Sequence, residues 1–167
     1  MRKALLICGI ASSLVYLLAN IIVPTQFAGY SVISQTVSEL SAINSPTRSL
    51  WVTLMIPYSL LLIAFGVGVW LSASGRTSLK VAGALMIVHA IFGFFWPPMH
   101  LRGEEFSLTD TLHIAWAAIT VPLMMLQIAF AAARLGTAFR IYSIITLVLL
   151  VVFGILTGLD GPNIAPS

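Results

Sequence analysis

The sequence predicts an all-α fold, a polytopic transmembrane bundle of five helices, and three observations lead to that prediction. Of the 167 residues, 59% are hydrophobic and only 8% are charged, whereas a soluble domain carries about 25% charged residues. The mean hydropathy is +1.05. Five stretches of about 20 mostly apolar residues can each cross a bilayer core of about 30 Å, and none has Lys or Arg in its interior.

The composition also excludes whole classes of protein. So few charges cannot cover a water-facing surface, which excludes a soluble globular protein. The composition also excludes a disordered, a collagen-like or a disulfide-stapled protein. The single cysteine, Cys8, is expected to pack as a small apolar side chain. The net charge is +3, but the eight cations are scattered and form no basic face, so we expect no nucleic-acid partner.

The five predicted spans belong to one transmembrane helical domain over residues 1–167. They cover approximately residues 4–23, 50–72, 79–97, 110–133 and 139–158. Each is expected to be a helix, because lipid cannot hydrogen-bond an unpaired backbone and the period-two pattern of barrel strands is absent. The basic start Met1-Arg2-Lys3 is typical of a signal peptide. The apolar run is too long for one, however, and no small-residue cleavage site follows, so we interpret it as an uncleaved helix.

The distribution of charge predicts that the N-terminus lies in the cytoplasm and the C-terminus outside. Six cations then lie on the cytoplasmic side and only Arg48 and Arg102 lie outside, as the positive-inside rule requires. The cytoplasmic cations are Arg2, Lys3, Arg76, Lys80, Arg134 and Arg140. All five acids, Glu39, Glu104, Glu105, Asp110 and Asp160, lie outside. This segregation indicates a functional outer face, or only that short cytoplasmic loops leave little room for acids.

The first outer loop, residues 24–49, is long enough to carry structure of its own. Thr36-Val37-Ser38-Glu39 fits a capping box and predicts a short helix near residues 37–43. Val37, Leu40 and Ile43 would share one face of that helix, which we expect at the membrane surface. Ser45-Pro46 then fits an N-cap with proline at the first helical position, which would start the second span.

Three groups of motifs along the chain suggest a family. The outer loop holds Tyr30-Ser31, Ser34-Gln35-Thr36-Val37-Ser38-Glu39-Leu40 and Pro46; later segments hold His100-Leu101-Arg102-Gly103, Thr109-Asp110 with His113, and Phe139-Arg140-Ile141-Tyr142-Ser143. Together they resemble the "domain of unknown function 998" family of small bacterial and archaeal membrane proteins, over nearly the whole chain. The resemblance implies an integral helical bundle in a prokaryotic plasma membrane. It implies no activity, because the family has no established one.

One feature departs from the resemblance. Members of that family usually continue into a sixth helix, whereas this chain ends at residues 161–167 with no further span. A truncated gene, a fragment and a genuine five-helix variant all fit this observation. A missing helix would leave one flank of the bundle, and any site shared with that helix, incomplete.

Four outer residues are candidate catalytic or metal-binding groups. Asp110 and His113 lie three apart at the start of the fourth span and so share a helix face, while His100 and Glu39 lie in loops on the same side. An acid beside an imidazole can orient it or raise its basicity, and all four side chains together can supply nitrogen and oxygen ligands to zinc or a similar ion. A divalent metal and no cofactor at all are equally expected.

Both acids in this group also have a purely structural interpretation. Ser107-x-x-Asp110 fits a capping box, and Asp110 suits the positive N-terminus of a helix; Glu39 belongs to the capping box of the outer loop. Arg102 is expected either to grip a phosphate or carboxylate, such as a lipid head group, or to pair with Glu104 or Glu105 at the surface.

Polar side chains recur along two spans at helical spacing. His113, Thr120 and Gln127 share one face of the fourth span, and Gly9, Ser13, Tyr16 and Asn20 share one face of the first. Both stripes should face inward, to hold helices together or to line an outward-opening cavity, since lipid would leave their polar groups unsatisfied. Asn20 and Asp160 end at the outer level and are candidate ligand-binding residues. His89, at mid-span, is expected to hydrogen-bond between helices.

These features suit two main functions. The first is a binding or accessory protein whose outer polar site recognises a lipid, a lipophilic molecule or another membrane protein, including a second copy of the chain. The second is an outer-leaflet hydrolase or transferase that acts on lipid or envelope precursors, with Asp110 and His113 as base or metal ligands, His100 and Glu39 completing the site, and Arg102 holding a phosphate. A small transporter is a weaker third alternative, because the sequence shows no repeat and no broken helix.

Overall fold

The computed structural model describes residues 1–160. Its helices are α1 (Arg2–Ile22), η1 (Val23–Gln26), η2 (Val37–Ser41), α2 (Arg48–Leu71), α3 (Thr77–Phe94), α4 (Leu108–Ala132) and α5 (Thr137–Asp160), of which η1 and η2 are short 3-10 helices. No strand occurs in this part of the chain. All five α-helices are long and apolar enough to cross a bilayer, so the protein has the architecture of a multi-pass membrane protein.

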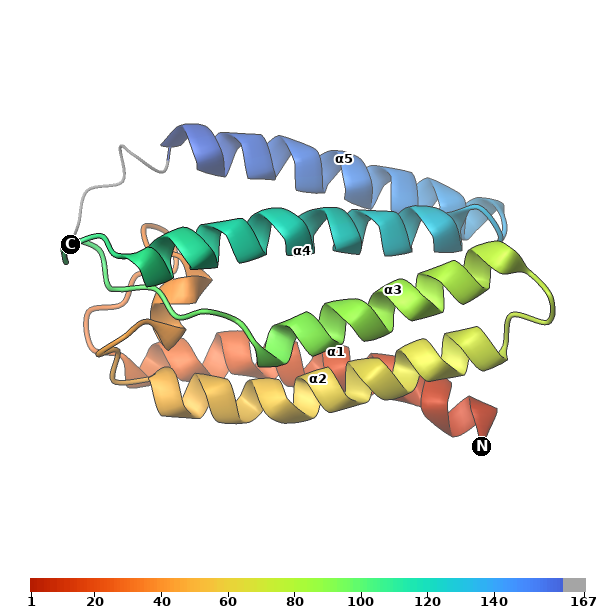
Figure 1. The fold of residues 1–167 in the computed structure, drawn as a ribbon, viewed down its shortest axis with the longest axis horizontal. Helices are drawn as coiled ribbons and strands as arrows, with labels where there is room; N and C mark the ends of the chain where they lie inside the picture. Colours follow the sequence, from red (N-terminus) through yellow and green to blue (C-terminus); the bar gives the residue numbers. More distant parts are fainter. Residues whose placement is uncertain (161–167) are drawn as a thin grey trace.

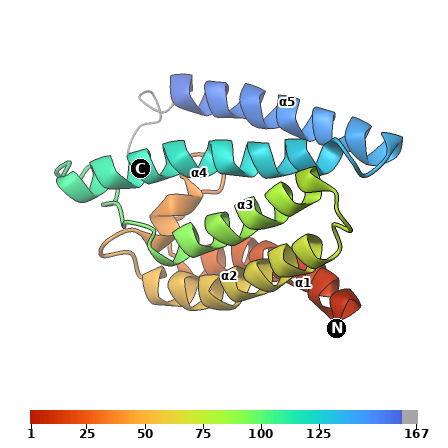
Figure 2. The same ribbon diagram turned by 45° about the vertical axis from the view of Figure 1, so that its right-hand side comes forward.

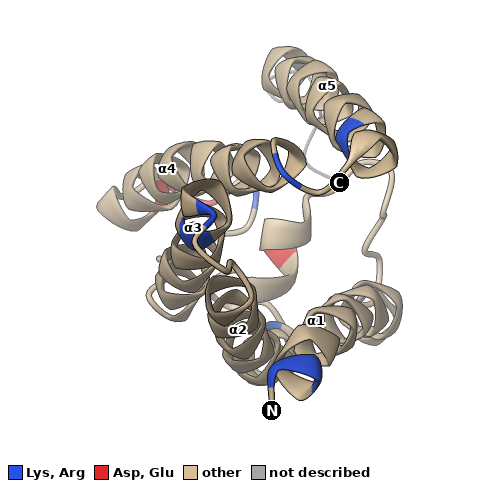
Figure 3. Ribbon diagram, turned by 90° about the vertical axis from the view of Figure 1, so that its right-hand side faces the viewer, with Lys and Arg blue, Asp and Glu red and all other residues tan. Residues whose placement is uncertain are grey.

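Successive α-helices run antiparallel to each other (Figure 1), and each packs against the next helix in the chain. α1 and α2, and α2 and α3, are packed along much of their length, whereas among the described helices α5 makes extended contact only with α4. In the view along the bundle the helices form an open arc, because α1 and α5 make no extended contact (Figure 3).

The two ends of this bundle differ. At one end, α1 and α3 end and α2 and α4 begin. The long segments 23–47 and 95–107 lie together there, and we call this end the loop end (Figures 1 and 2). At the other, the turn end, residues 72–76 and 133–136 form short turns. The six cations that the sequence analysis groups together all lie at or near the turn end (Figure 3).

Two of the predicted helix boundaries are corrected by the structure. α3 ends at Phe94 instead of residue 97, because Pro97-Pro98 lacks backbone donors and disfavours helix in the preceding residue. α2 starts at Arg48, so Ser45-Pro46 is not its N-cap. The hydroxyls of Ser45 and Thr47 instead bond to each other, and Thr47 Oγ1 donates to Leu40 O at 2.9 Å, which fixes η2 against the start of α2.

η2 keeps the predicted capping box but not the predicted surroundings. It ends at Ser41 and is a 3-10 helix, and its Leu40 is completely buried against Ala19, Val23 and Trp51. Leu40 is therefore a core residue at the loop end, and the expectation that it lies at the membrane surface is wrong. Val37 remains exposed on the same element. Because Leu40 is buried, η2 lies across the loop end of the bundle.

The tightest helix contact is that between α2 and α3, where two glycines face each other. A Cβ added at Gly83 would lie 2.6 Å from Gly66 O and 2.8 Å from Trp70 N, and one added at Gly66 would lie 2.9 Å from Gly83 O. Small residues at a transmembrane helix contact allow this close approach of the two backbones.

The contact predicts that Gly83→Ala destabilises the protein. The methyl group has no room, and overpacking of this kind costs about 1–3 kcal/mol, more than the roughly 1 kcal/mol by which alanine improves helix propensity. Thermal unfolding in detergent, followed by circular dichroism, measures the effect. Gly154→Ala on α5 is the matched control, because nothing lies within 4 Å of its added Cβ. An unchanged melting temperature for Gly83→Ala would contradict the described packing.

Candidate functional site

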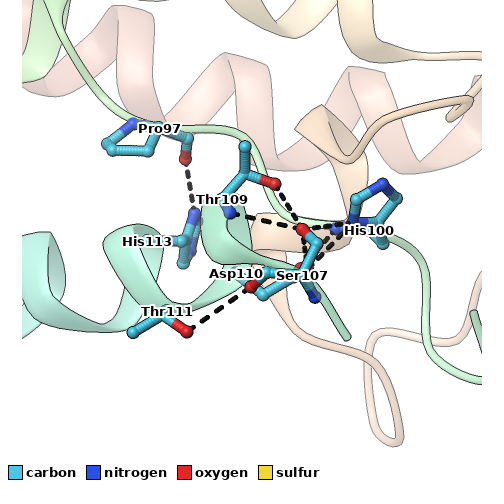
Figure 4. A network of polar contacts seen from close by, with 7 residues as sticks. All are labelled: Pro97, His100, Ser107, Thr109, Asp110, Thr111 and His113. Carbon is cyan, nitrogen blue, oxygen red and sulfur yellow. Dashed lines mark hydrogen bonds and ion pairs between the residues drawn. The ribbon is translucent and has the colours of Figure 1, made fainter. Parts of the chain in front are cut away.

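Asp110, in the first turn of α4, fastens the segment that leads into that helix. Its Oδ1 accepts the backbone N–H of His100 at 2.7 Å, and its Oδ2 accepts from Ser107 N and Ser107 Oγ, both at 2.8 Å. His100 Nδ1 lies 2.9 Å from Oδ2 (Figure 4). Asp110 is buried and Ser107 is the N-cap of α4, so the predicted capping box is present. The carboxylate thus holds both ends of the loop between His100 and α4.

Glu39 performs the same task for the segment before α2, and it is only 1% exposed. Its Oε1 accepts the backbone N–H of Thr36 at 3.1 Å, which completes the capping box of η2. Its Oε2 accepts from Gln35 Nε2 at 2.8 Å. Arg102 Nε lies 3.1 Å from Oε1 and forms an ion pair across the two loop segments. The predicted surface pairing of Arg102 with Glu104 or Glu105 is therefore corrected to a pairing with a buried acid.

Tyr30 supports the same loop. Its hydroxyl donates to Thr36 O at 3.1 Å. Burial, together with the nearby Glu39 carboxylate, raises the pKa of Tyr30 above its ordinary value, so the phenol keeps the proton that it donates.

His113 joins three parts of the loop end from the second turn of α4. Its Nδ1 lies 2.7 Å from Pro97 O, and its Nε2 lies 3.1 Å from Ser38 Oγ in η2. Pro97 O can only accept a hydrogen bond, whereas the indole N–H of Trp96, 3.0 Å from the same Nδ1, can only donate one, so these two contacts require different tautomers of His113. The indole of Trp96 stands edge-on to the imidazole, with its ring centroid 5.4 Å away. His113 is buried and holds η2, the segment after α3 and α4 together.

The four residues predicted as one metal or catalytic cluster are thus divided among separate contacts. His100 and Asp110 form one pair, Glu39 pairs with Arg102, and His113 binds Ser38 and Pro97. In residues 1–160 no group of three or more His, Cys, Asp or Glu side chains is placed to share a metal ion. The prediction of a four-ligand centre is corrected accordingly, since the capping interpretation of Glu39 and Asp110 describes their contacts.

Beneath these contacts lies a cavity of about 710 Å³ between α1, α2, α3 and α4. Its apolar lining includes Leu17, Val52, Ile56, Val121 and Met124. η2 and residues 96–98 contribute to its wall at the loop end. α1 and α4 both line it but make no extended contact with each other, so helix packing does not close the cavity on that side.

Ten polar side chains also line this cavity. They are Ser13, Tyr16, Asn20, Ser38, Ser41, Arg48, Tyr58, Ser59, His89 and Thr120. In the predicted stripe on α1, Ser13, Tyr16 and Asn20 line the cavity, while Gly9 packs against Phe65 of α2. On α4, His113, Thr120 and Gln127 are buried as predicted. Asn20, a predicted ligand-binding residue, lies at this cavity, with its Nδ2 bonded to Tyr16 O at 2.8 Å. The side chain of Asp160 lies outside what the structure describes.

His89 has the interhelical partner that the sequence analysis expects. Gln127 Nε2 lies 3.4 Å from His89 Nδ1 and so links α3 to α4 near mid-span. The Oε1 atom of the same glutamine is buried without a hydrogen-bond partner among the described residues. This polar pair marks the depth that the cavity reaches, since His89 also contributes to its lining.

Sequence reasoning missed the position of Arg48. The sequence identifies Arg48 only as one of two outer cations, whereas the structure places it in the cavity wall at the start of α2. Two signals were available in the sequence: no acid lies in the first turn of that helix, where acids are favoured, and none lies between residues 40 and 55.

The buried ion pair predicts that Glu39→Gln destabilises the loop end. Neutralising Glu39 breaks a buried ion pair, which costs about 3 kcal/mol and lowers the melting temperature by roughly 6–12 °C. Glu105→Gln is the control, because Glu105 is an exposed acid in the same part of the fold. Equal melting temperatures for the two variants would show that the pair contributes nothing.

Comparison with known proteins adds a family but no activity. No curated protein and no solved structure matches the chain. A family model described as "Protein of unknown function (DUF998)" matches residues 10–165, which is nearly the whole chain. The motifs of the first loop, the loop before α4 and the start of α5 all lie inside that match, as the resemblance implied. The chain therefore belongs to the DUF998 family of proteins of unknown function.

Proposed function

We propose that this protein is a membrane-embedded binding or accessory protein that holds a lipid or lipophilic ligand in the cavity between α1 and α4. The cavity itself is the observation that carries the proposal. Its volume of about 710 Å³ falls within the range of about 300–1,000 Å³ typical of small-molecule sites. Most of its lining surface is apolar, which suits an alkyl chain, and polar side chains are available to orient the polar end of a ligand.

The arrangement of the cavity supports access from the bilayer. Leu17 of α1 and Val121 of α4 line the same cavity although their helices are not packed together. We place the route of a hydrocarbon chain from the bilayer between these two helices. Both helices are long enough to span the membrane, so this side of the cavity lies at the level of the lipid chains.

The geometry supports binding more than the alternative of catalysis. The pair of Asp110 and His100 resembles an acid–base pair, because Asp110 contacts Nδ1 and leaves Nε2 of His100 available. His100, however, lines a polar depression with Glu104, Glu105 and Ser107 that shares no lining residue with the apolar cavity. A base placed there does not reach a ligand in the cavity. The remaining acids of the predicted catalytic set are occupied in capping η2 and α4.

The proposal includes an orientation and a compartment. The loop end faces outward and the turn end faces the cytoplasm of a prokaryotic cell, because the turn end carries six cations that the positive-inside rule places in the cytoplasm. In this orientation the cavity opens at the level of the outer leaflet of the plasma membrane. Membrane lipids are then its nearest ligands, and a membrane-protein partner or a second copy of the chain would act beside it.

Cysteine labelling tests the orientation. In a Cys8→Ala background, Glu105→Cys at the loop end should react with a membrane-impermeant maleimide in intact cells, and Ser74→Cys at the turn end should react only after lysis. Both positions are exposed, so access to the thiol depends on the side of the membrane. The reverse labelling pattern would contradict the proposed orientation.

A cavity-filling substitution tests the proposed function. Val52→Trp should weaken the binding of a tritiated single-chain lipid about tenfold, because losing about 60 Å² of apolar contact costs about 1.5 kcal/mol. Scintillation-proximity binding to purified protein in detergent measures this. Val151→Trp is the matched control, since Val52 and Val151 are 47% and 43% exposed but only Val52 lines the cavity. Absence of saturable binding to the unsubstituted protein, or an equal loss in both variants, would contradict the proposal.

A further inference from the structure

Arg48 is a cation in the wall of a cavity that contains no acid. Of the 22 side chains that line the cavity, none is Asp or Glu. Arg48 Nη1 donates to Ser41 O at 3.0 Å, and among the described residues the guanidinium makes no other hydrogen bond or ion pair. The Nε and Nη2 donors thus have no partner in residues 1–160. Guanidinium donors in this geometry bind carboxylate or phosphate oxygens in a bidentate manner.

The backbone around Arg48 adds to the positive potential. Arg48 is the first residue of α2, a helix of 24 residues whose first turn contains no acid. The N-terminus of such a helix carries a partial positive charge, which a cation at this position does not neutralise. The side chain and the helix therefore both favour an anion at the same point of the cavity wall.

The guanidinium of Arg48 lies at the loop end of the cavity. The polar residues Ser38, Ser41 and Arg48 lie at its loop end, whereas Val52 and Ile56 continue its wall along α2. From Arg48 to Ser59, the last α2 residue in the wall, the helix rises about 16 Å, roughly half the thickness of a 30 Å hydrocarbon core. A ligand that fills this space has its polar group near the membrane interface and its apolar part at the depth of the acyl chains.

The volume is sufficient for one acyl chain. If a methylene group occupies roughly the 30 Å³ that a water molecule has in the liquid, a chain of 16–18 carbons needs about 500 Å³. The cavity of about 710 Å³ therefore accommodates one such chain.

We propose that the cavity selects a single-chain anionic lipid whose carboxylate or phosphate group binds Arg48 and whose acyl chain lies along α2 between Leu17 and Val121. The inference rests on the proposed function and goes further by naming the chemical class of the ligand. Arg48 serves as the residue that determines specificity for the head group. Charge complementarity commits the site to an anion, because no Asp or Glu lines the cavity and a neutral head group would supply no counter-charge to the guanidinium.

Competition between lipids of matched chain and different head group tests the inference. Oleate, oleoyl lysophosphatidylglycerol and neutral monoolein each compete with a tritiated oleoyl ligand for purified full-length protein in detergent. The two anionic lipids should bind at least about tenfold more tightly than monoolein, as expected for hydrogen bonds to charged groups. The difference between oleate and lysophosphatidylglycerol identifies whether the carboxylate or the phosphate is preferred.

Substitution of the cation separates a role in specificity from a role in folding. Arg48→Gln should reduce the affinity for both anionic lipids to that of monoolein and leave monoolein binding unchanged; Arg48→Lys should keep part of the preference, since the charge remains without the guanidinium fork. Arg76→Gln, at the exposed turn end, is the control and should change nothing. Melting temperatures report whether each variant is folded.

Three outcomes would overturn the inference. Monoolein that binds the unsubstituted protein as tightly as the anionic lipids would show that the head-group charge is not recognised, although lipid binding itself stands. An equal loss for all three lipids in Arg48→Gln would assign Arg48 a structural role. No saturable binding of any lipid would contradict the proposed function as well, so the two failures are distinguishable.

Discussion

The buried carboxylate of Glu39 is the interaction on which the loop end depends. A charge that is 1% exposed persists only when its oxygens are fully bonded, and here Thr36, Gln35 and Arg102 all contribute to that bonding. The same carboxylate caps η2 and pairs with the segment after α3, so it fixes two chain segments relative to each other. With Glu39 in place, Leu40 is directed into the core and η2 lies across the end of the bundle.

The cavity results from the position of η2 at the loop end and from the way the helices pack. Close glycine contacts hold α2 and α3 together, and each helix packs mainly on its neighbours in sequence, so α1 and α4 remain apart. η2 and the segment after α3 occupy one end of the space between them, where His113 binds both. The resulting cavity has a cation at its loop end and a mainly apolar surface. We interpret this arrangement as a receptacle for one anionic lipid chain.

How much the sequence predicts depends on how far apart the interacting residues lie. The five spans were predicted within about three residues at each end, because an apolar stretch of membrane length is a local signal. The capping boxes at Thr36–Glu39 and Ser107–Asp110 were also predicted, since their partners lie three residues apart. Family membership was predicted from short motifs that run through most of the chain.

The contacts that form the site join residues far apart in the sequence, so short-range sequence patterns do not predict them. For Arg102 the sequence suggests either a phosphate or carboxylate ligand or the nearby acids Glu104 and Glu105, whereas in the structure it pairs with Glu39 in a different loop. Leu40 was placed at the membrane surface because the burial of η2 depends on where α1 and α2 lie. The same holds for Arg48, whose importance arises only because α1, α3 and α4 enclose the space in front of it.

Native mass spectrometry of the protein extracted gently from its own membrane tests the central claim most directly. The account predicts a mass consistent with one bound single-chain anionic lipid per chain, retained when weakly associated lipids are removed and lost in Arg48→Gln. A protein that sheds all lipid together, or that retains neutral two-chain lipids to the same extent as anionic single-chain lipids, would contradict it.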